Sequence, residues 1–195
     1  MVKRRNFIII ILLVFGISAF GITEFIIKPR QEEKRAKYRL EQQNSLTHDF
    51  KGLFKYKTKY MGDSSNIVNL NYSLPLGNVP RTNEIDSDNL EYIINYEESA
   101  LKIGKEKVKT DLIYNATANF ALIDNLEAIT FNFTDSSYKI ARNDVEDWYK
   151  IDLSSLVDET KWSKEIQEKL EEKNYVDEFW KANFMEIKDR VASSF

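Results

Sequence analysis

The stretch "KEKVKTDLIYNATANFALIDNLEAITFNF", residues 105–133, passes from a helical period of apolar residues to the composition of a strand. Between Lys105 and Leu126, apolar residues recur every three or four positions, which predicts a helix of about five or six turns. Residues 128–133 and the segment "YKIA" at 138–141 flank a turn-forming "TDSS", and together they predict a β-hairpin. The helix is expected to lie on the sheet, which makes the fold class α+β. Its apolar positions are Val108, Leu112, Ala116, Phe120 and Ile123.

Further elements are predicted on both sides of this stretch. Residues 89–99, "NLEYIINYEES", alternate apolar and polar side chains as a strand does. Asn143 and Glu146 have the spacing of a capping box, which predicts a short helix, and residues 160–192 predict C-terminal helices. Residues 46–195 are therefore expected to form one domain, a small and mainly antiparallel sheet packed by helices. The C-terminal apolar positions at helical spacing are Trp162, Ile166, Leu170, Val176, Trp180, Phe184, Ile187 and Val191.

The N-terminal 27 residues predict a membrane anchor. An almost wholly apolar run at residues 7–27 spans about 31 Å as a helix, close to one hydrocarbon core, and a basic head precedes it. A cleaved signal peptide is the alternative, although its apolar region is usually shorter. Residues 28–45 are charged and predict a helical stalk. Because no second apolar segment brings the chain back, the C-terminal domain is expected on the extracytoplasmic side; positive-inside counting alone favours the reverse orientation.

Composition removes several classes of function. The chain has no cysteine, which excludes disulfide bonds and thiolate chemistry, and it has one histidine. The formal net charge is −3, and the acidic excess lies in residues 46–195, which argues against nucleic acid as a partner. Carboxylate-rich segments do not follow the register of a calcium loop, and no phosphate-binding loop occurs. We expect no metal and no cofactor.

The segment "KYMGDSSNIVNL", residues 59–70, contains a Gly-Asp-Ser sequence like that of lipase-like hydrolases. Such a serine needs a histidine base, yet the single His48 lies about four helical turns, roughly 24 Å, before Ser64 if the intervening chain is one helix. A structural explanation is complete: residues 46–61 predict an amphipathic helix, Gly62 a left-handed cap, and Asp63 or Ser64 the cap of the next helix. No catalytic residue is expected.

Tyrosines and tryptophans are more numerous than one small core is expected to bury, which suggests that some of them line a binding groove. The alternative is that most are half-buried core residues with hydroxyl groups reaching water. If a groove exists, its polar edge is predicted at the joint between the two helices. The predicted ligand-binding residues are Tyr60, Asp63, Ser64 and Asn125.

Several of these segments occur together in a known order. "KYMGDSSNIVNL" is followed by "LPLG", "LEYIINY", "FALIDNLEAITFNF" and "ARNDVEDWYKIDL". Over residues 52–153 this order resembles a family of domains of unknown function found in membrane-anchored extracytoplasmic proteins of Gram-positive bacteria. The resemblance implies sensing or adapting at the cell envelope and supplies no reaction.

The expected function is a membrane-anchored binding, sensor or adaptor module of the bacterial cell envelope, with a protein, peptide or glycan ligand. A structural scaffold that docks a membrane protein through its C-terminal aromatic helices is the first alternative. A serine hydrolase that uses the Gly-Asp-Ser-Ser motif is the second.

Overall fold

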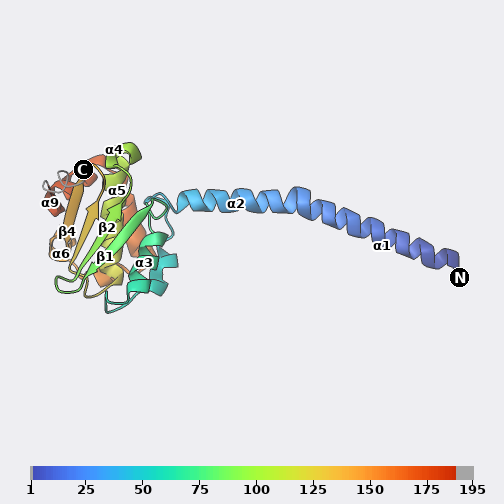
Figure 1. The fold of residues 1–195 in the computed structure, drawn as a ribbon, viewed down its shortest axis with the longest axis horizontal. Coiled ribbons are helices and arrows are strands. Elements are labelled where there is room, and N and C mark those ends of the chain that lie inside the picture. Colours follow the sequence, from blue (N-terminus) through green and yellow to red (C-terminus); the bar gives the residue numbers. More distant parts are fainter. Residues whose placement is uncertain (1, 188–195) are drawn as a thin grey trace. The chain divides into compact units, whose positions relative to one another are not determined.

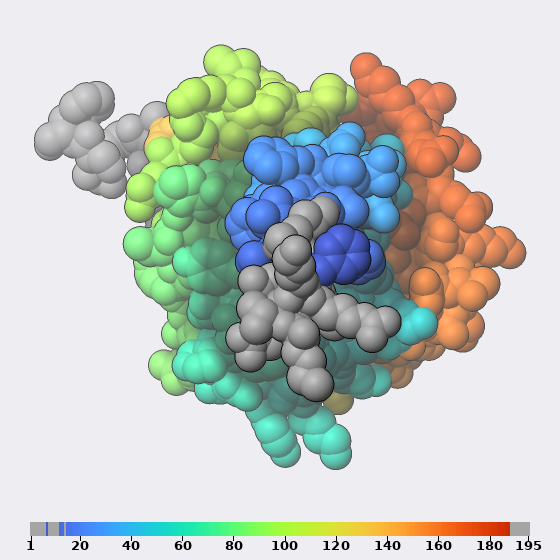
Figure 2. All heavy atoms as spheres, turned by 90° about the vertical axis from the view of Figure 1, so that its right-hand side faces the viewer, coloured from blue at the N-terminus to red at the C-terminus, as the bar shows by residue number. Residues whose placement is uncertain are grey.

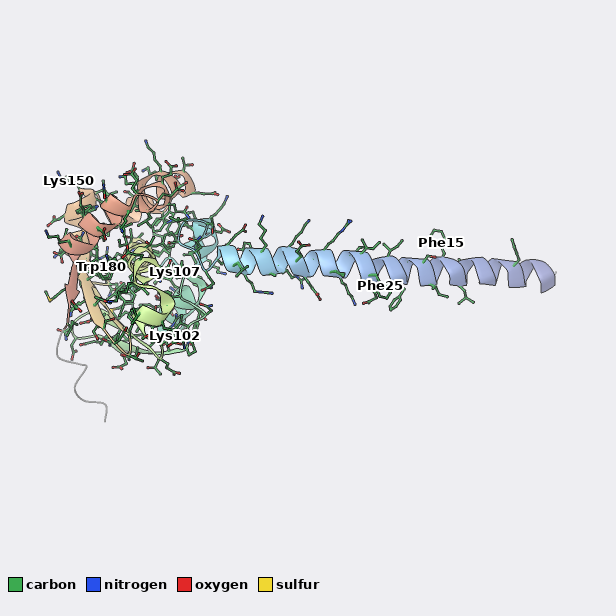
Figure 3. All side chains as sticks on the ribbon, turned by 90° about the horizontal axis from the view of Figure 1, so that it is seen from above. Phe15, Phe25, Lys102, Lys107, Lys150 and Trp180 are labelled. Atoms are coloured by element: carbon green, nitrogen blue, oxygen red, sulfur yellow. The ribbon has the colours of Figure 1, made fainter. Side chains whose placement is uncertain are left out.

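The computed structural model describes residues 2–187, and the chain divides into two compact units, Met1–Glu41 and Gln42–Phe195 (Figure 1). The first unit is helical. It consists of α1 (Val2–Ile22), the π-helical turn η1 (Thr23–Ile27) and α2 (Lys28–Glu41). Its described apolar side chains are exposed, and Phe15 and Phe25 extend outward from the helix (Figure 3).

The predicted anchor at residues 7–27 is divided between α1 and η1. Within the described part of the chain, residues 2–187, no helix has both the length and the apolar character needed to span a bilayer. This finding does not support the predicted transmembrane helix. The predicted stalk, in contrast, is helical as far as Glu41.

The second unit is built on a five-stranded sheet in the order β1-β2-β3-β4-β5. Three pairings are antiparallel, as predicted, but β2 and β3 run parallel, so the sheet is mixed. The parallel pair follows from the chain path, because a helical crossover separates these two strands. The strands are β1 (Arg81–Asp86), β2 (Glu91–Tyr96), β3 (Ala128–Asn132), β4 (Ser137–Ala141) and β5 (Phe184–Glu186).

The crossover is α5 (Lys105–Leu122), which confirms the helix predicted from residues 105–126. Every residue from Asp111 to Leu122 is buried, so this part of α5 is enclosed on all sides rather than on one face. Its buried polar residues are hydrogen bonded: Asn119 exchanges amide bonds with Asn71 of α3 (Ser64–Ser73). α5 is therefore the central helix of the unit.

Short helices cover the core around α5. The C-terminal segments, orange and red in Figure 2, lie together along one side of the second unit. Within them, the stripe predicted from Trp162 to Leu170 is buried core. The remaining elements are η2 (Phe50–Tyr56), α4 (Ala100–Ile103), α6 (Arg142–Tyr149), η3 (Leu153–Leu156), α7 (Glu159–Trp162), η4 (Ser163–Gln167), α8 (Glu168–Leu170) and α9 (Lys173–Asn183).

The predicted amphipathic helix at residues 46–61 is wrong. Only the 3-10 helix η2 forms there, and the side chain of Asp49 caps it by accepting from the Gly52 N–H at 3.3 Å. Its buried residues, Phe50 and Leu53, are three positions apart, which suits the tighter 3-10 period. Gly62 is not left-handed either; among the described glycines, Gly104 is the one with a positive φ.

Two further predictions need correction. α6 begins at Arg142 without a side-chain cap, so Asn143 does not form a capping box; the Arg142 N–H instead donates to Glu127 O at 2.8 Å. Phe184 begins strand β5 and pairs with Ile140, so the predicted C-terminal helix ends before it. Val191 lies outside the described residues.

Candidate functional site

Two loops meet where the sequence predicted a binding edge. Thr58 forms an isolated parallel bridge with Ile123, and its backbone bonds to Leu122 O at 2.9 Å and to the Asp124 N–H at 3.0 Å. Asn125 lies on the same junction, since its Oδ1 accepts from the Met61 N–H at 2.6 Å. These contacts hold residues 58–61 against the C-terminal end of α5.

The structure gives most of the predicted site residues a local structural role. Asp63 caps α3 by accepting from the Asn66 N–H at 3.1 Å, as predicted, and the Ser64 N–H donates to Gly62 O at 2.9 Å. Asn125 fixes the loop before Gly62. Tyr60 is 68% exposed and is thus available to a ligand. The four residues gather around one loop, but they do not line the large cavity beside it.

That cavity, with a volume of about 740 Å³, opens between the end of α5, α6 and the turn after α6. Sequence reasoning missed it, because its walls come from separate segments of the chain. Lys150 extends from the surface of the second unit at its rim (Figure 3). The lining residues are Lys57, Phe120, Asp124, Arg142, Glu146, Asp147, Lys150, Ile151, Asp152 and Ser154.

Arg142 forms a fixed wall of the cavity. It is 8% exposed, and its Nε donates to Leu126 O at 2.7 Å. Nη2 donates to Phe120 O at 3.0 Å and to Ile123 O at 2.5 Å, while Nη1 reaches Glu146 at 3.2 Å. The last carbonyl groups of a helix lack partners within it, so Arg142 supplies the donors that close α5. Its role here is structural.

The cavity is lined by charges of both signs. Within residues 2–187 no ion pair involves Lys57, Lys150, Asp124 or Asp147. Hydrogen bonds from Ser154 lower the pKa of Asp152, which is therefore ionised at neutral pH. Cations and carboxylates that are not satisfied by each other face one hollow and can bind a ligand that carries both charges.

Residues 53–143 match the model of a family described as "Domain of unknown function (DUF4825)". Residues 53–143 are a DUF4825 domain. This confirms the predicted resemblance to a domain of unknown function; the bacterial source and the anchoring that the resemblance implied stay predictions. No curated protein matches the chain, and no solved structure does.

The boundaries of the DUF4825 domain divide the cavity. The domain runs from η2 to the start of α6, so it contains Lys57, Asp124 and Arg142. The opposite wall, from Glu146 to Ser154, follows the domain. The cavity therefore joins the DUF4825 domain to the helices that come after it in the chain.

The DUF4825 domain does not pair its Gly-Asp-Ser serine with the single histidine. Both ring nitrogens of His48 are engaged, Nδ1 with the Tyr114 hydroxyl at 2.9 Å and Nε2 with Ser73 O at 2.8 Å. Burial lowers the pKa of His48, which favours the neutral ring. In the described structure, Ser64 begins α3 and makes no hydrogen bond to His48. Across residues 2–187, no three potential metal-ligating side chains come together.

Proposed function

We propose that the second unit is a non-enzymatic binding module that recognises a peptide segment of a cell-envelope protein. The observation that carries this proposal is the 740 Å³ cavity with unpaired charges of both signs. Its volume falls in the range of about 300 to 1,000 Å³ that is usual for ligand sites. A protein segment supplies both kinds of charge, together with backbone groups for the polar wall formed by Asp152 and Ser154.

We also propose that the first unit attaches this module to the cell membrane as a single-pass anchor, with the second unit on the extracytoplasmic side. The support is the sequence of residues 7–27, whose 21 positions extend about 31 Å as a helix. The exposed apolar side chains along α1 and η1 agree with a lipid environment. A sensor or adaptor would need such an attachment to stay near its envelope partner.

The alternative of a scaffold that docks through its C-terminal aromatic stripe is not favoured. Trp162 is fully buried, stacks on Phe50 with ring centroids 3.5 Å apart, and packs edge-on against Tyr114. Trp180 is half-buried and stacks on Phe184 at 4.1 Å. These rings hold the second unit together and offer little free surface to a partner.

The proposal is tested by crosslinking in intact cells, followed by pull-down of the full chain. The test variant combines Lys57→Glu with Asp147→Lys, which reverses two exposed charges of the cavity. Lys59→Glu is the matched control, because Lys59 is also exposed in the same loop and does not line the cavity. A partner recovered with wild type and Lys59→Glu, but lost from the double variant at unchanged Tm, is the expected result.

Recovery of the same partner by the double variant would refute the cavity as the binding site. The ligand-binding residues predicted from the sequence are tested beside it with Tyr60→Ala and Asp63→Asn, the second of which keeps a capping side chain on α3. Loss of the partner from these variants, with the cavity variant unaffected, would place the site at the loop instead.

A further inference from the structure

Arg81 begins β1 and is a buried cation without a carboxylate partner. It is 8% exposed, and in the described part of the chain it forms no ion pair. One nitrogen, Nη1, donates to Leu76 O at 3.0 Å, in the turn between α3 and β1. Arginine is rarely buried unless its charge is paired, because removing a cation from water is costly. This residue therefore needs an explanation beyond its bond to the Leu76 carbonyl and its hydrogen bond with Tyr96.

Two tyrosine rings hold the guanidinium in place. Its central carbon lies 4.4 Å from the ring centroid of Tyr72 and 5.8 Å from that of Tyr96. Burial raises the pKa of Tyr96 to about 12, while the charge of Arg81 and a hydrogen bond with it act in the opposite direction. The rings and the Leu76 carbonyl together limit how the guanidinium can turn.

The remaining edge of the guanidinium is free. Nε and Nη2 are both buried, and neither has an acceptor at hydrogen-bonding geometry. These two nitrogens form one side of the planar group, where two N–H bonds run parallel. That arrangement matches the two oxygens of a carboxylate, which arginine binds in bidentate fashion.

The Tyr92 hydroxyl, on the neighbouring strand, is a second buried polar group without a partner in the described structure. Tyr92 is fully buried, and its hydroxyl has no hydrogen-bond partner in the described structure. Burial raises the pKa of Tyr92 and the charge of Arg81 lowers it, so the two groups influence each other. Two unsatisfied groups of this kind in one core region are costly unless an acceptor reaches them.

We propose that Arg81, with the hydroxyls of Tyr92 and Tyr96, forms a binding site for a single carboxylate group, gated by Tyr72. Tyr72 is 51% exposed, so its ring can leave the guanidinium without unpacking the core. A carboxylate is favoured over a phosphate because one cation neutralises one negative charge, and a second buried charge would remain unpaired. The carboxylate is that of a chain terminus or of an acidic side chain.

This site is separate from the proposed peptide cavity, because neither Arg81 nor any of the three tyrosines lines that cavity. The inference therefore does not depend on the proposed function. If the cavity variants still bind the partner, carboxylate binding at Arg81 is unaffected by that result. If Arg81 binds no carboxylate, the proposed peptide cavity is likewise unaffected.

The test follows the Nε–H resonance of Arg81 by NMR in the full chain, purified in a mild detergent, during titration with small carboxylates. N-acetylalanine represents a chain terminus, the α-amide of N-acetylglutamate represents an acidic side chain, and N-acetylalanine amide is the neutral control. Inorganic phosphate is a fourth arm. We expect saturable shifts with one or both carboxylates and none with the amide.

Arg81→Lys keeps the positive charge but removes the two parallel N–H donors, so it should weaken carboxylate binding at least tenfold. Arg39→Lys is the control: Arg39 is exposed in α2, outside the second unit, so this variant should bind as wild type does. Tyr72→Ala removes the ring that lies over the guanidinium and should therefore speed the association of the carboxylate. This variant tests the proposal if Arg81→Lys does not fold.

Three results would overturn the inference. The first is the absence of a carboxylate-dependent shift in both wild type and Tyr72→Ala. The second is equal binding by folded Arg81→Lys. The third is tighter binding of inorganic phosphate than of either carboxylate, which would contradict the single-charge argument.

Discussion

Replacing Arg142 by methionine tests how the second unit closes its central helix. Methionine has a similar length but no donor, so the substitution removes the bonds from Arg142 to one carbonyl group in the last turn of α5 and to two in the residues that follow it. Those carbonyl groups are buried behind the cavity wall. Leaving them without donors should destabilise the whole unit, because α5 runs through its core.

The magnitude can be worked from the contacts. Hydrogen bonds to a charged group contribute about 1.5 to 3 kcal/mol each, but bonds that share one side chain do not add fully. The loss of one partner from a buried charged network typically costs about 3 to 5 kcal/mol. At about 2 to 4 °C per kcal/mol for a unit of this size, Tm should fall by about 10 °C.

The assay is thermal unfolding followed by near-ultraviolet circular dichroism, since all three tryptophans lie in the second unit. Glu146→Gln is the control, because it removes only the partly exposed ion pair to Arg142 and should cost less than about 1 kcal/mol. A methionine variant that loses less than about 1 kcal/mol would refute the capping role. So would a Glu146→Gln loss of equal size, which would assign the stabilisation to the ion pair.

Three smaller predictions follow. Gly77→Ala should cost about 2 to 3 kcal/mol in urea unfolding, because its Cβ would lie 2.3 and 2.6 Å from backbone oxygens, whereas Gly62→Ala meets nothing within 4 Å and should be near neutral. Asp63→Ala should lose about 1 kcal/mol of capping energy, measured in the same way, and Asp63→Asn little. Burial lowers the pKa of His48, so the unfolded chain takes up a proton first and stability should fall as pH drops below about 6.5; His48→Gln should flatten urea midpoints measured between pH 5 and 7.

The sequence predicts best the elements whose apolar period is long and local. The helix at residues 105–126 and the hairpin at 128–141 are confirmed, because each has enough apolar positions to fix its period. The sequence analysis missed β1, because its residues, "RTNEID" at 81–86, are mostly polar. β1 lies at the edge of the sheet, where a strand has a neighbouring strand on one side only and can expose one face to solvent. The helix predicted at residues 46–61 was wrong, because apolar residues of a 3-10 helix and a loop fall at helical intervals in that segment.

The candidate site was predictable only in part. A capping residue such as Asp63 acts on its own neighbours, and its role could be read from the order of residues. The cavity could not, because Lys57, Asp124 and Lys150 approach one another only after the sheet and α5 have formed. The pairing of Thr58 with Ile123, which shapes one wall, is likewise a long-range contact with no local signal.

Arg81 and Arg142 differ in how many of their nitrogens have hydrogen-bond acceptors, a difference that the sequence does not reveal. Both are 8% exposed, and neither stands in a recognisable motif; Arg81 is the first residue of β1, and Arg142 follows the last residue of β4. Arg142 bonds through all three nitrogens, and its burial is explained by the fold it closes. Arg81 keeps two nitrogens unsatisfied on one edge, which the fold alone does not explain. A buried guanidinium with two unsatisfied N–H donors is costly unless an acceptor can reach it. Arg81 has such donors and Arg142 does not, which is why we assign the carboxylate site to Arg81.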